Sequence, residues 1–125
     1  MPGAWRPYFF VGYNSIVANA TESVEFSVGA TEEFEGKAIR IHATSVGFDV
    51  IRIADQGGTP YTNASSTSVI DGNLLTAATK NEFAEIELAE PLNLGPNSKL
   101  TVDITDTSGS TNELWVLLIG KMRSV

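Results

Sequence analysis

Apolar and polar residues alternate along much of this chain, most clearly near its C-terminal end. From Leu100 to Thr105 every second residue is apolar, a period of two that gives a strand one apolar and one wet face. The polar stretch 107–112 then predicts a turn, and Leu114–Ile119 follows as six unbroken apolar residues. A short run of this kind, with Trp115 inside it, fits a strand buried on both faces. We therefore expect a closing hairpin whose second strand runs through the middle of the core, with Trp115 in that core.

The same reading predicts further strands upstream. Clean alternation covers Glu22–Val28, Lys37–Thr44 and Phe83–Leu88. Tyr8–Val11 is an aromatic strand candidate with an interruption at Gly12, and a continuation of the strand to Val17 stays open. The stretch Phe48–Ala54 changes its apolar phase between Val50 and Ile51. Such a shift indicates a bulge or burial of both faces.

The segments between these strands read as turns and loops. We expect an acidic loop at Gly29–Gly36, the strongest turn at Asp55–Pro60, a loop or weak edge strand at Tyr61–Ser68, a compact turn at Asp71–Asn73, a helical turn at Thr76–Lys80 and a connection at Glu90–Asn97. Residues 1–7 hold two prolines and a glycine, which predicts an extended arm. Its Trp5 either folds back onto its own domain or reaches a neighbouring subunit.

Eight or nine short strands without a long helix predict an all-β sandwich over residues 8–125. A jelly roll, with eight strands in two Greek keys, is the expected topology. An immunoglobulin-like sandwich is the alternative, because the core Trp and disulfide common in that fold are not obligatory.

Composition argues against nucleic acid and membranes as binding partners, but it does not identify a partner. The chain has 125 residues, no cysteine and a formal net charge of −7. Scattered basic residues in an acidic chain argue against nucleic acid as a general partner. No stretch reaches the roughly 18 apolar residues of a membrane span, and the N-terminus lacks the order of a secretion signal. We therefore expect a protein made in the cytoplasm that does not bind membranes.

No catalytic constellation stands out among the polar residues. His42 is the only histidine and cannot supply the imidazole cluster of a cupin metal site. Glu85 and Glu87 share one strand face, as two solvated carboxylates would, and the acidic groups at 32–35 and 103–113 lack the spacing of a calcium loop. We expect Asp106, with Ser108 and Asn112, to shape a turn by bonding its backbone. The chain is therefore not expected to be an enzyme or to hold a cofactor or metal.

Three stretches, Leu94–Ile104, Asp106–Gly109 and Leu114–Gly120, give the chain a family resemblance. This turn-strand-turn-strand pattern resembles small jelly-roll structural proteins of tailed bacteriophages, including capsid decoration or cement proteins. The resemblance implies a non-enzymatic protein of the virion capsid surface that forms trimers or dimers and binds across major capsid subunits.

The ends of the chain and its exposed aromatic candidates are the expected partner contacts. These residues are Trp5, Arg6, Tyr8, Tyr61, Lys121 and Arg123. The alternative function is a carbohydrate- or receptor-binding module of a phage tail fibre or spike. In that case Trp5, Tyr8, Tyr13, Tyr61 and Trp115 could form a sugar platform.

Overall fold

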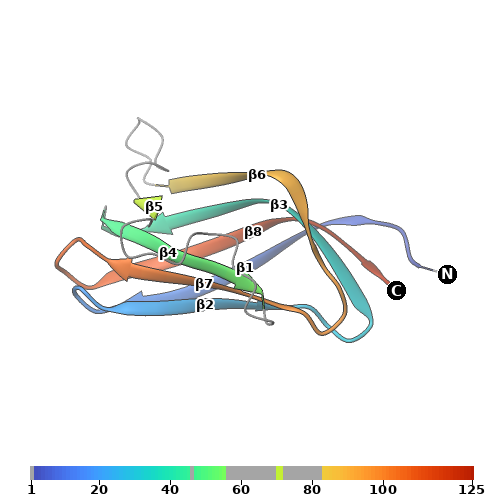
Figure 1. The fold of residues 1–125 in the computed structure, drawn as a ribbon, viewed down its shortest axis with the longest axis horizontal. Helices are drawn as coiled ribbons and strands as arrows, with labels where there is room; N and C mark the ends of the chain where they lie inside the picture. Colours follow the sequence, from blue (N-terminus) through green and yellow to red (C-terminus); the bar gives the residue numbers. More distant parts are fainter. Residues whose placement is uncertain (1, 46, 56–69, 72–82) are drawn as a thin grey trace.

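The chain folds into two antiparallel four-stranded sheets that pack face to face. The computed structural model describes residues 2–45, 47–55, 70–71 and 83–125. One sheet has the order β1-β8-β3-β6 and the other β2-β7-β4-β5, and their strands run along the long axis of the molecule (Figure 1). The strands are β1 Arg6–Ile16, β2 Thr21–Ser27, β3 Glu32–Ala43, β4 Phe48–Asp55, β5 Ile70–Asp71, β6 Phe83–Leu94, β7 Lys99–Asp106 and β8 Asn112–Ser124.

This strand order confirms the predicted all-β sandwich with jelly-roll topology. Among the described strands, β4 alone is followed by a strand of its own sheet, β5, and every other one is followed by a strand in the opposite sheet. An immunoglobulin sandwich would instead place consecutive strands such as A and B in one sheet. The described residues form seven full strands and the two-residue β5, the low end of the eight or nine short strands expected.

The predicted closing hairpin is wrong in its pairing. β7 pairs with β2 and β4, whereas β8 lies between β1 and β3 in the other sheet. The turn at 107–111 therefore crosses from one sheet to the other, which hydrophobic periodicity alone does not reveal. The central position of β8 is as expected.

Two predicted loops are strand. β3 begins at Glu32, inside the expected acidic loop, because Glu33 and Glu35 pair in register with Arg123 and Lys121 of β8. β6 continues through Pro91 to Leu94 where a connection was expected. Proline is tolerated there because β6 is an edge strand, and its missing N–H breaks no inner ladder.

β1 runs without interruption through Gly12 to Ile16, close to the continuation to Val17 that the sequence left open. A Cβ at Gly12 would lie 2.2 Å from Val24 Cγ1 of β2 in the facing sheet. The glycine thus lets β1 approach β2 closely. Because β1 begins at Arg6, the last two residues of the expected arm belong to the sandwich. The division into an arm and a domain stays a prediction.

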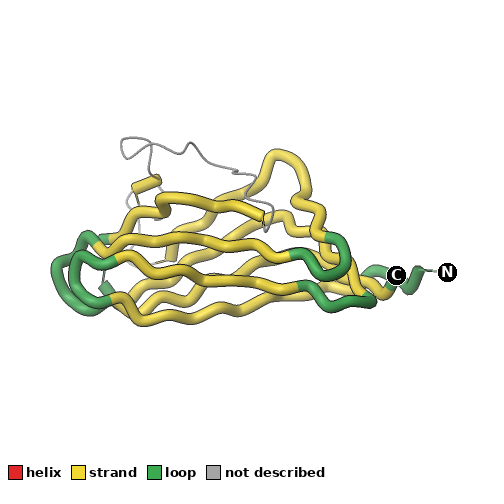
Figure 2. The backbone as a smooth tube through the Cα atoms, turned by 60° about the horizontal axis from the view of Figure 1, so that its bottom comes forward, coloured by secondary structure: helices red, strands yellow, loops and turns green. Residues whose placement is uncertain are grey.

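The core lies between the two sheets (Figure 2) and is filled by the inward positions of the alternating strands. The predicted inward sets at 24–28, 39–43 and 100–104 are all buried. The phase change at Ile51 is confirmed as a register shift between Val50 and Arg52. The fully buried large side chains are Phe34, Ile16, Ile39, Ile41, Leu100, Ile104, Leu114, Leu118, Met122, Val50, Val102 and Val116.

A buried polar network joins three turns at one end of the sandwich. Asp106 Oδ1 accepts hydrogen bonds from the backbone N and Oγ of Ser108 (3.1 and 2.6 Å) and from Asn112 Nδ2 (3.2 Å). Its Oδ2 accepts from the backbone N of Asn19 (3.0 Å), at the turn between β1 and β2. Asn112 in turn bonds the backbone N and O of Ser45, between β3 and β4. This confirms the predicted capping role of Asp106.

Several predictions lie wholly or partly outside the described residues. They are the turn Asp55–Pro60 beyond its first residue, the stretch Tyr61–Ser68 with the candidate contact Tyr61, the turn at Asp71–Asn73 beyond its first residue, and the helical turn Thr76–Lys80.

The closest backbone approach in the first sheet can be tested at Gly120. A Cβ there would lie 2.1 Å from the backbone O of Glu35 and 2.8 Å from Gly36 Cα, so backbone must move. We expect Gly120→Ala to lower the free energy of unfolding by about 2 kcal/mol or more, measured by urea unfolding. In the control Gly95→Ala the added Cβ meets only Ser98 Oγ at 4.0 Å. That substitution should change stability by less than about 1 kcal/mol; equal effects would contradict the argument.

The buried carboxylate predicts a dependence of stability on pH. Burial raises the pKa of Asp106, but the hydrogen bonds from Ser108, Asn19 and Asn112 outweigh it and lower the pKa from 3.8 to about 2. The folded state therefore favours the ionised form. This contribution, about 2 kcal/mol, is complete above pH 4 and is lost as the pH falls from 4 to 2.

Asp106→Asn should flatten this part of the pH profile and lower stability at pH 7, as measured by denaturant unfolding. The control Asp103→Asn removes one carboxylate from the outside of β7 and leaves the network intact. It should retain the loss of stability between pH 4 and 2. An Asp106→Asn profile as steep as that of the unaltered protein would contradict the assignment.

Candidate functional site

Five of the six residues predicted as partner contacts lie near the point where the two chain ends meet, in two separate contacts. The Trp5 ring has Arg123 Cζ at 4.3 Å and Lys121 Nζ at 4.9 Å from its centroid. Arg6 Cζ lies 5.6 Å from the centroid of Tyr8. We call Trp5, Arg6, Tyr8, Lys121 and Arg123 the terminal cluster. Trp5 thus folds back onto its own domain, the first of the two arrangements considered for it.

The cations of the terminal cluster are paired with carboxylates of β3. Arg6 Nη2 lies 3.3 Å from Glu32 Oε2, and Lys121 Nζ lies 3.8 Å from Glu35 Oε2. Arg123 is paired with Glu33. Partly exposed pairs of this kind contribute little to stability. They do, however, bring the acidic side chains of the expected loop at Gly29–Gly36 next to the basic residues of the chain ends, so that the charges neutralise each other.

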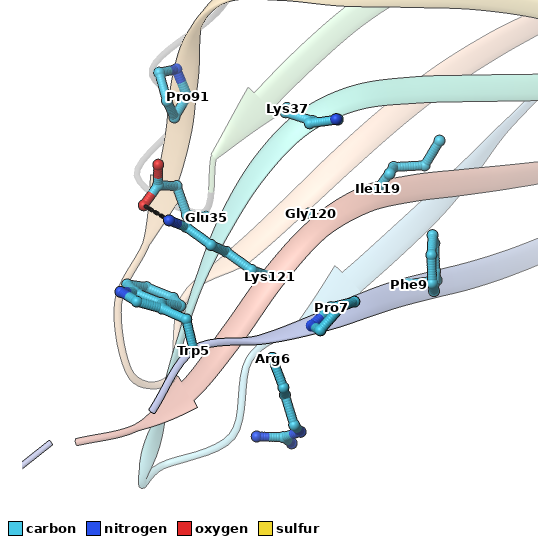
Figure 3. Close-up of a pocket in the computed structure, with 10 residues that line it drawn as sticks. All are labelled: Trp5, Arg6, Pro7, Phe9, Glu35, Lys37, Pro91, Ile119, Gly120 and Lys121. Carbon is cyan, nitrogen blue, oxygen red and sulfur yellow. Dashed lines mark ion pairs between the residues drawn. The ribbon is translucent and has the colours of Figure 1, made fainter. Parts of the chain in front are cut away.

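An open depression of about 560 Å³ adjoins the terminal cluster. It is lined by Trp5, Pro7 and Phe9 near one edge, by Lys121 and Ile119 of β8, and by Glu35, Lys37 and Pro91 on the other side (Figure 3). The strand register explains the space. Gly36 pairs with Leu92 and Ala38 with Glu87, so residues 88–91 of β6 stand opposite Lys37 alone.

The outside of the first sheet carries an apolar surface formed by β1 and β8. Phe9, Val11 and Tyr13 pair in register with Ile119, Leu117 and Trp115. Phe9 is 54% exposed, Val11 67%, Tyr13 51% and Trp115 37%, while Leu117 and Ile119 are half-buried. We call these six residues the outer apolar face. The prediction that Leu114–Ile119 is buried on both faces, with Trp115 in the core, is therefore wrong.

Polar groups border the outer apolar face at one end. The ring of His42, an exposed residue of β3, lies 5.4 Å from that of Trp115, and Tyr13 lies 5.2 Å from it on the other side. The Tyr13 hydroxyl donates a 2.7 Å hydrogen bond to Glu113 Oε1. This bond, with smaller contributions from burial and the carboxylate charge, raises the pKa of Tyr13 above 10. The tyrosine is thus a neutral donor at physiological pH.

The outside of the other sheet has the opposite character. Thr21 and Thr105 share a hydrogen bond of 2.6 Å, and Ser23 donates one of 2.6 Å to Asp103. Lys99 Nζ lies 3.6 Å from Glu25 Oε1. This surface has the polar, wet outer face usual for an antiparallel sheet. The apolar exterior of β1 and β8 therefore distinguishes one side of the molecule from the other.

Within the described part of the chain, no three His, Asp or Glu side chains gather as metal ligands. The same residues include no helix of the length and apolarity needed to cross a membrane. Asp106, whose pKa is strongly lowered, is buried in its turn network rather than exposed at a cleft. Among the described residues, the terminal cluster, its depression and the outer apolar face are candidate functional sites.

Sequence reasoning missed most of the outer apolar face. Phe9, Val11, Leu117 and Ile119 were not singled out, although Phe9, Val11 and Tyr13 alternate with the inward Phe10. An unbroken apolar strand run arises when its second face is covered by the same chain or when it is covered by another molecule. The unbroken apolar run at Leu114–Ile119 predicts that both faces are covered, but it does not show whether the second face is covered by this chain or by another molecule.

Comparison with known proteins adds little to this description. No family model matches the chain. No curated protein matches it either. Similar solved structures include the capsid of Helicobacter pylori bacteriophage KHP30 (9% identity, TM-score 0.45, covering 98% of this chain and 99% of that one). They also include the major capsid protein P2 of bacteriophage PM2 (14%, 0.48, 94% and 45%) and the Drosophila NLP core (16%, 0.37, 91% and 96%). At these values we draw no functional argument from the likeness.

The exposure of the outer apolar face can be tested with one substitution at two sites. Val11→Thr places a hydroxyl in solvent, so we expect the free energy of unfolding to change by less than about 0.5 kcal/mol. Val116→Thr makes the same change on the inward face of β8, at a fully buried residue. It should cost about 1–3 kcal/mol, measured by urea unfolding in dilute solution. A comparable loss at Val11 would mean that its side chain is covered within the monomer.

Proposed function

We propose that this chain is a non-enzymatic structural protein of a virion that reinforces a capsid shell by binding across its major capsid subunits. The observation that carries the proposal is the outer apolar face. Three aromatic rings and a valine stand in solvent on one rigid sheet, beside aliphatic side chains. Contiguous exposed apolar surface of this kind marks protein–protein contact sites.

The fold and the sequence pattern support the more specific part of the proposal. Jelly rolls recur in viral capsid and lectin domains, which is an analogy at the level of fold. The C-terminal pattern resembles decoration proteins of tailed phages, which sit on completed shells. Together these favour a capsid position among the many possible protein assemblies.

The terminal cluster suits contact with the capsid subunits. It combines a large aromatic side chain, Trp5, with Arg6, Lys121 and Arg123 on one end of the sandwich. Trp, Tyr and Arg are the residues that most often dominate binding energy at protein interfaces. The adjoining depression gives this end a concave surface for a side chain or loop of the shell.

The proposed mechanism is mechanical. Each copy bound over a joint between subunits buries apolar area at roughly 25 cal/mol per Å² and raises the free energy needed to separate them. No proton transfer, bond cleavage or cofactor enters this mechanism.

A protein partner is favoured over the carbohydrate-binding alternative. Sugar sites need aromatic platforms set among polar groups that can bond hydroxyls. Here the exposed rings of Phe9, Tyr13 and Trp115 lie beside Val11, Leu117 and Ile119. Most of this surface is apolar and excludes water, and the polar groups Glu113 and His42 border it at one end only.

The proposal predicts that the purified protein binds shells of its major capsid protein that lack it. Binding should raise their rupture temperature, measured by scanning calorimetry and by release of packaged DNA. Removing residues 1–5, which precede β1, should weaken binding more than folding, because this segment lies outside the strands and Trp5 packs on the partly exposed side chains of Lys121 and Arg123. Thr21→Ala, on the polar outside of β2, is the matched control and should bind normally. Absence of binding by the intact protein would refute the proposal.

A further inference from the structure

The depression beside the terminal cluster has a largely apolar lining. The apolar residues come from the start of the chain, from β6 and from β8: Trp5, Pro7, Phe9, Pro91 and Ile119. Phe9 is 54% exposed, and Ile119 is half-buried. The volume of about 560 Å³ lies within the range of roughly 300–1,000 Å³ found for ligand pockets. The depression therefore has room for a large apolar side chain and its neighbours.

Cations outnumber carboxylates in this lining, although the chain as a whole carries −7. Arg6, Lys37 and Lys121 line the depression together with a single carboxylate, Glu35. Lys121 is paired with Glu35, and Arg6 with Glu32. Among the residues that the structure describes, no carboxylate is paired with Lys37, which is exposed. Its positive charge is therefore available to a ligand.

The strand register explains why Lys37 lies at this depression. It is the extra residue of β3 at the register shift between Gly36 and Ala38, and a bulge of this kind re-aims a side chain. Ala38 pairs with Ile119, and Ile119 pairs with Phe9. Lys37 and these two apolar side chains thus lie on three neighbouring strands, spaced roughly 4.8 Å apart. In Figure 3 the Lys37 amine points away from the pair formed by Lys121 and Glu35.

A ligand that matches both features carries an apolar group and a carboxylate close together. Nucleic acid is not favoured, because phosphate binding needs several clustered cations and the lining has one unpaired cation among its described residues. A free fatty acid is not favoured either, because small-molecule sites enclose most of their ligand and this depression is open. For a sugar, the largest ring of the lining, Trp5, is already in contact with Lys121 and Arg123. An acidic and apolar segment of a protein matches the lining best.

We propose that the depression binds an extended protein segment in which a large apolar residue and an Asp or Glu lie two positions apart. Such residues share one face of the segment, roughly 6–7 Å apart. The apolar side chain packs on Phe9 and Ile119, and the carboxylate pairs with the ammonium of Lys37. This deepens the proposed function, on which it rests for the identity of the partner chain, by naming the chemistry of the shell segment that enters the depression.

The test is a titration of the full chain with blocked peptides, followed by NMR through the indole N–H signals of its two tryptophans. The probes are acetyl-Gly-Phe-Ala-Glu-Gly-amide, the same peptide with Gln for Glu, and the same peptide with Ala for Phe. We expect the first to bind with a dissociation constant below about 5 mM. The Gln peptide should bind at least about threefold more weakly, the size expected for one partly exposed ion pair. The Ala peptide should not bind measurably.

The two tryptophans also report where the peptide binds. The Trp5 signal should shift, whereas Trp115, six residues before Lys121 on β8, should not. Absence of binding by the Phe–Glu peptide, equal binding of the Glu and Gln peptides, or a shift of Trp115 alone overturns the proposal. Decanoate carries an apolar group and a carboxylate without a peptide. Tighter binding of decanoate than of the Phe–Glu peptide would indicate a lipid site and would also overturn the proposal.

Lys37→Gln tests the assigned cation without breaking an ion pair of the described residues. It should reduce the preference for the Glu peptide over the Gln peptide to less than about 1.5-fold. The control Lys99→Gln makes the same charge change on the outside of the other sheet and should keep the preference. A preference that survives Lys37→Gln contradicts the assignment.

The shell assay keeps this inference apart from the proposed function. If the unaltered protein binds shells, Lys37→Gln should bind them more weakly than Lys99→Gln does. Shell binding that is unaffected by Lys37→Gln refutes the acidic segment alone. A protein that binds the Phe–Glu peptide at Trp5 but leaves shells unbound refutes the shell-binding function alone.

Discussion

The insertion of β8 between β1 and β3 is the constraint on which the structure depends. Its inward residues Leu114, Val116 and Leu118 are fully buried between the sheets, each contributing about 1.5–3 kcal/mol relative to an exposed side chain. β1 joins its sheet only through β8. Because side chains alternate, the register that buries these three residues also fixes which residues face outward. The same pairing that forms the core therefore creates the outer apolar face.

Local alternation was enough to predict the strands with one wet face. The inward sets of β2, β3 and β7 follow directly from period two, and the bulge near Ile51 follows from a break in that period. Alternation did not predict which strands pair with each other. The turn at 107–111 looks like a hairpin turn, but it crosses between sheets, and Asp106 just before it accepts a hydrogen bond from Asn19 of a distant turn.

The errors in the acidic segment and at the candidate site have different causes. Glu33 and Glu35 read as loop because their partners lie about ninety residues away along the chain. The terminal cluster was foreseen because both chain ends held aromatic and basic residues. The outer apolar face was missed because a strand that is apolar on both faces can have its second face buried within its own chain or left exposed for another molecule. The sequence does not distinguish the two cases.

The backbone N of Gly3 donates a 2.8 Å hydrogen bond to the backbone O of Ser124, so the first and last strands end side by side (Figure 1). A short linker could therefore close the backbone into a circle, with new ends opened at a turn elsewhere. By the same geometry, a cargo peptide fused at either end would project from a single pole of the sandwich. Such a peptide would lie beside the terminal cluster rather than over the middle of either sheet.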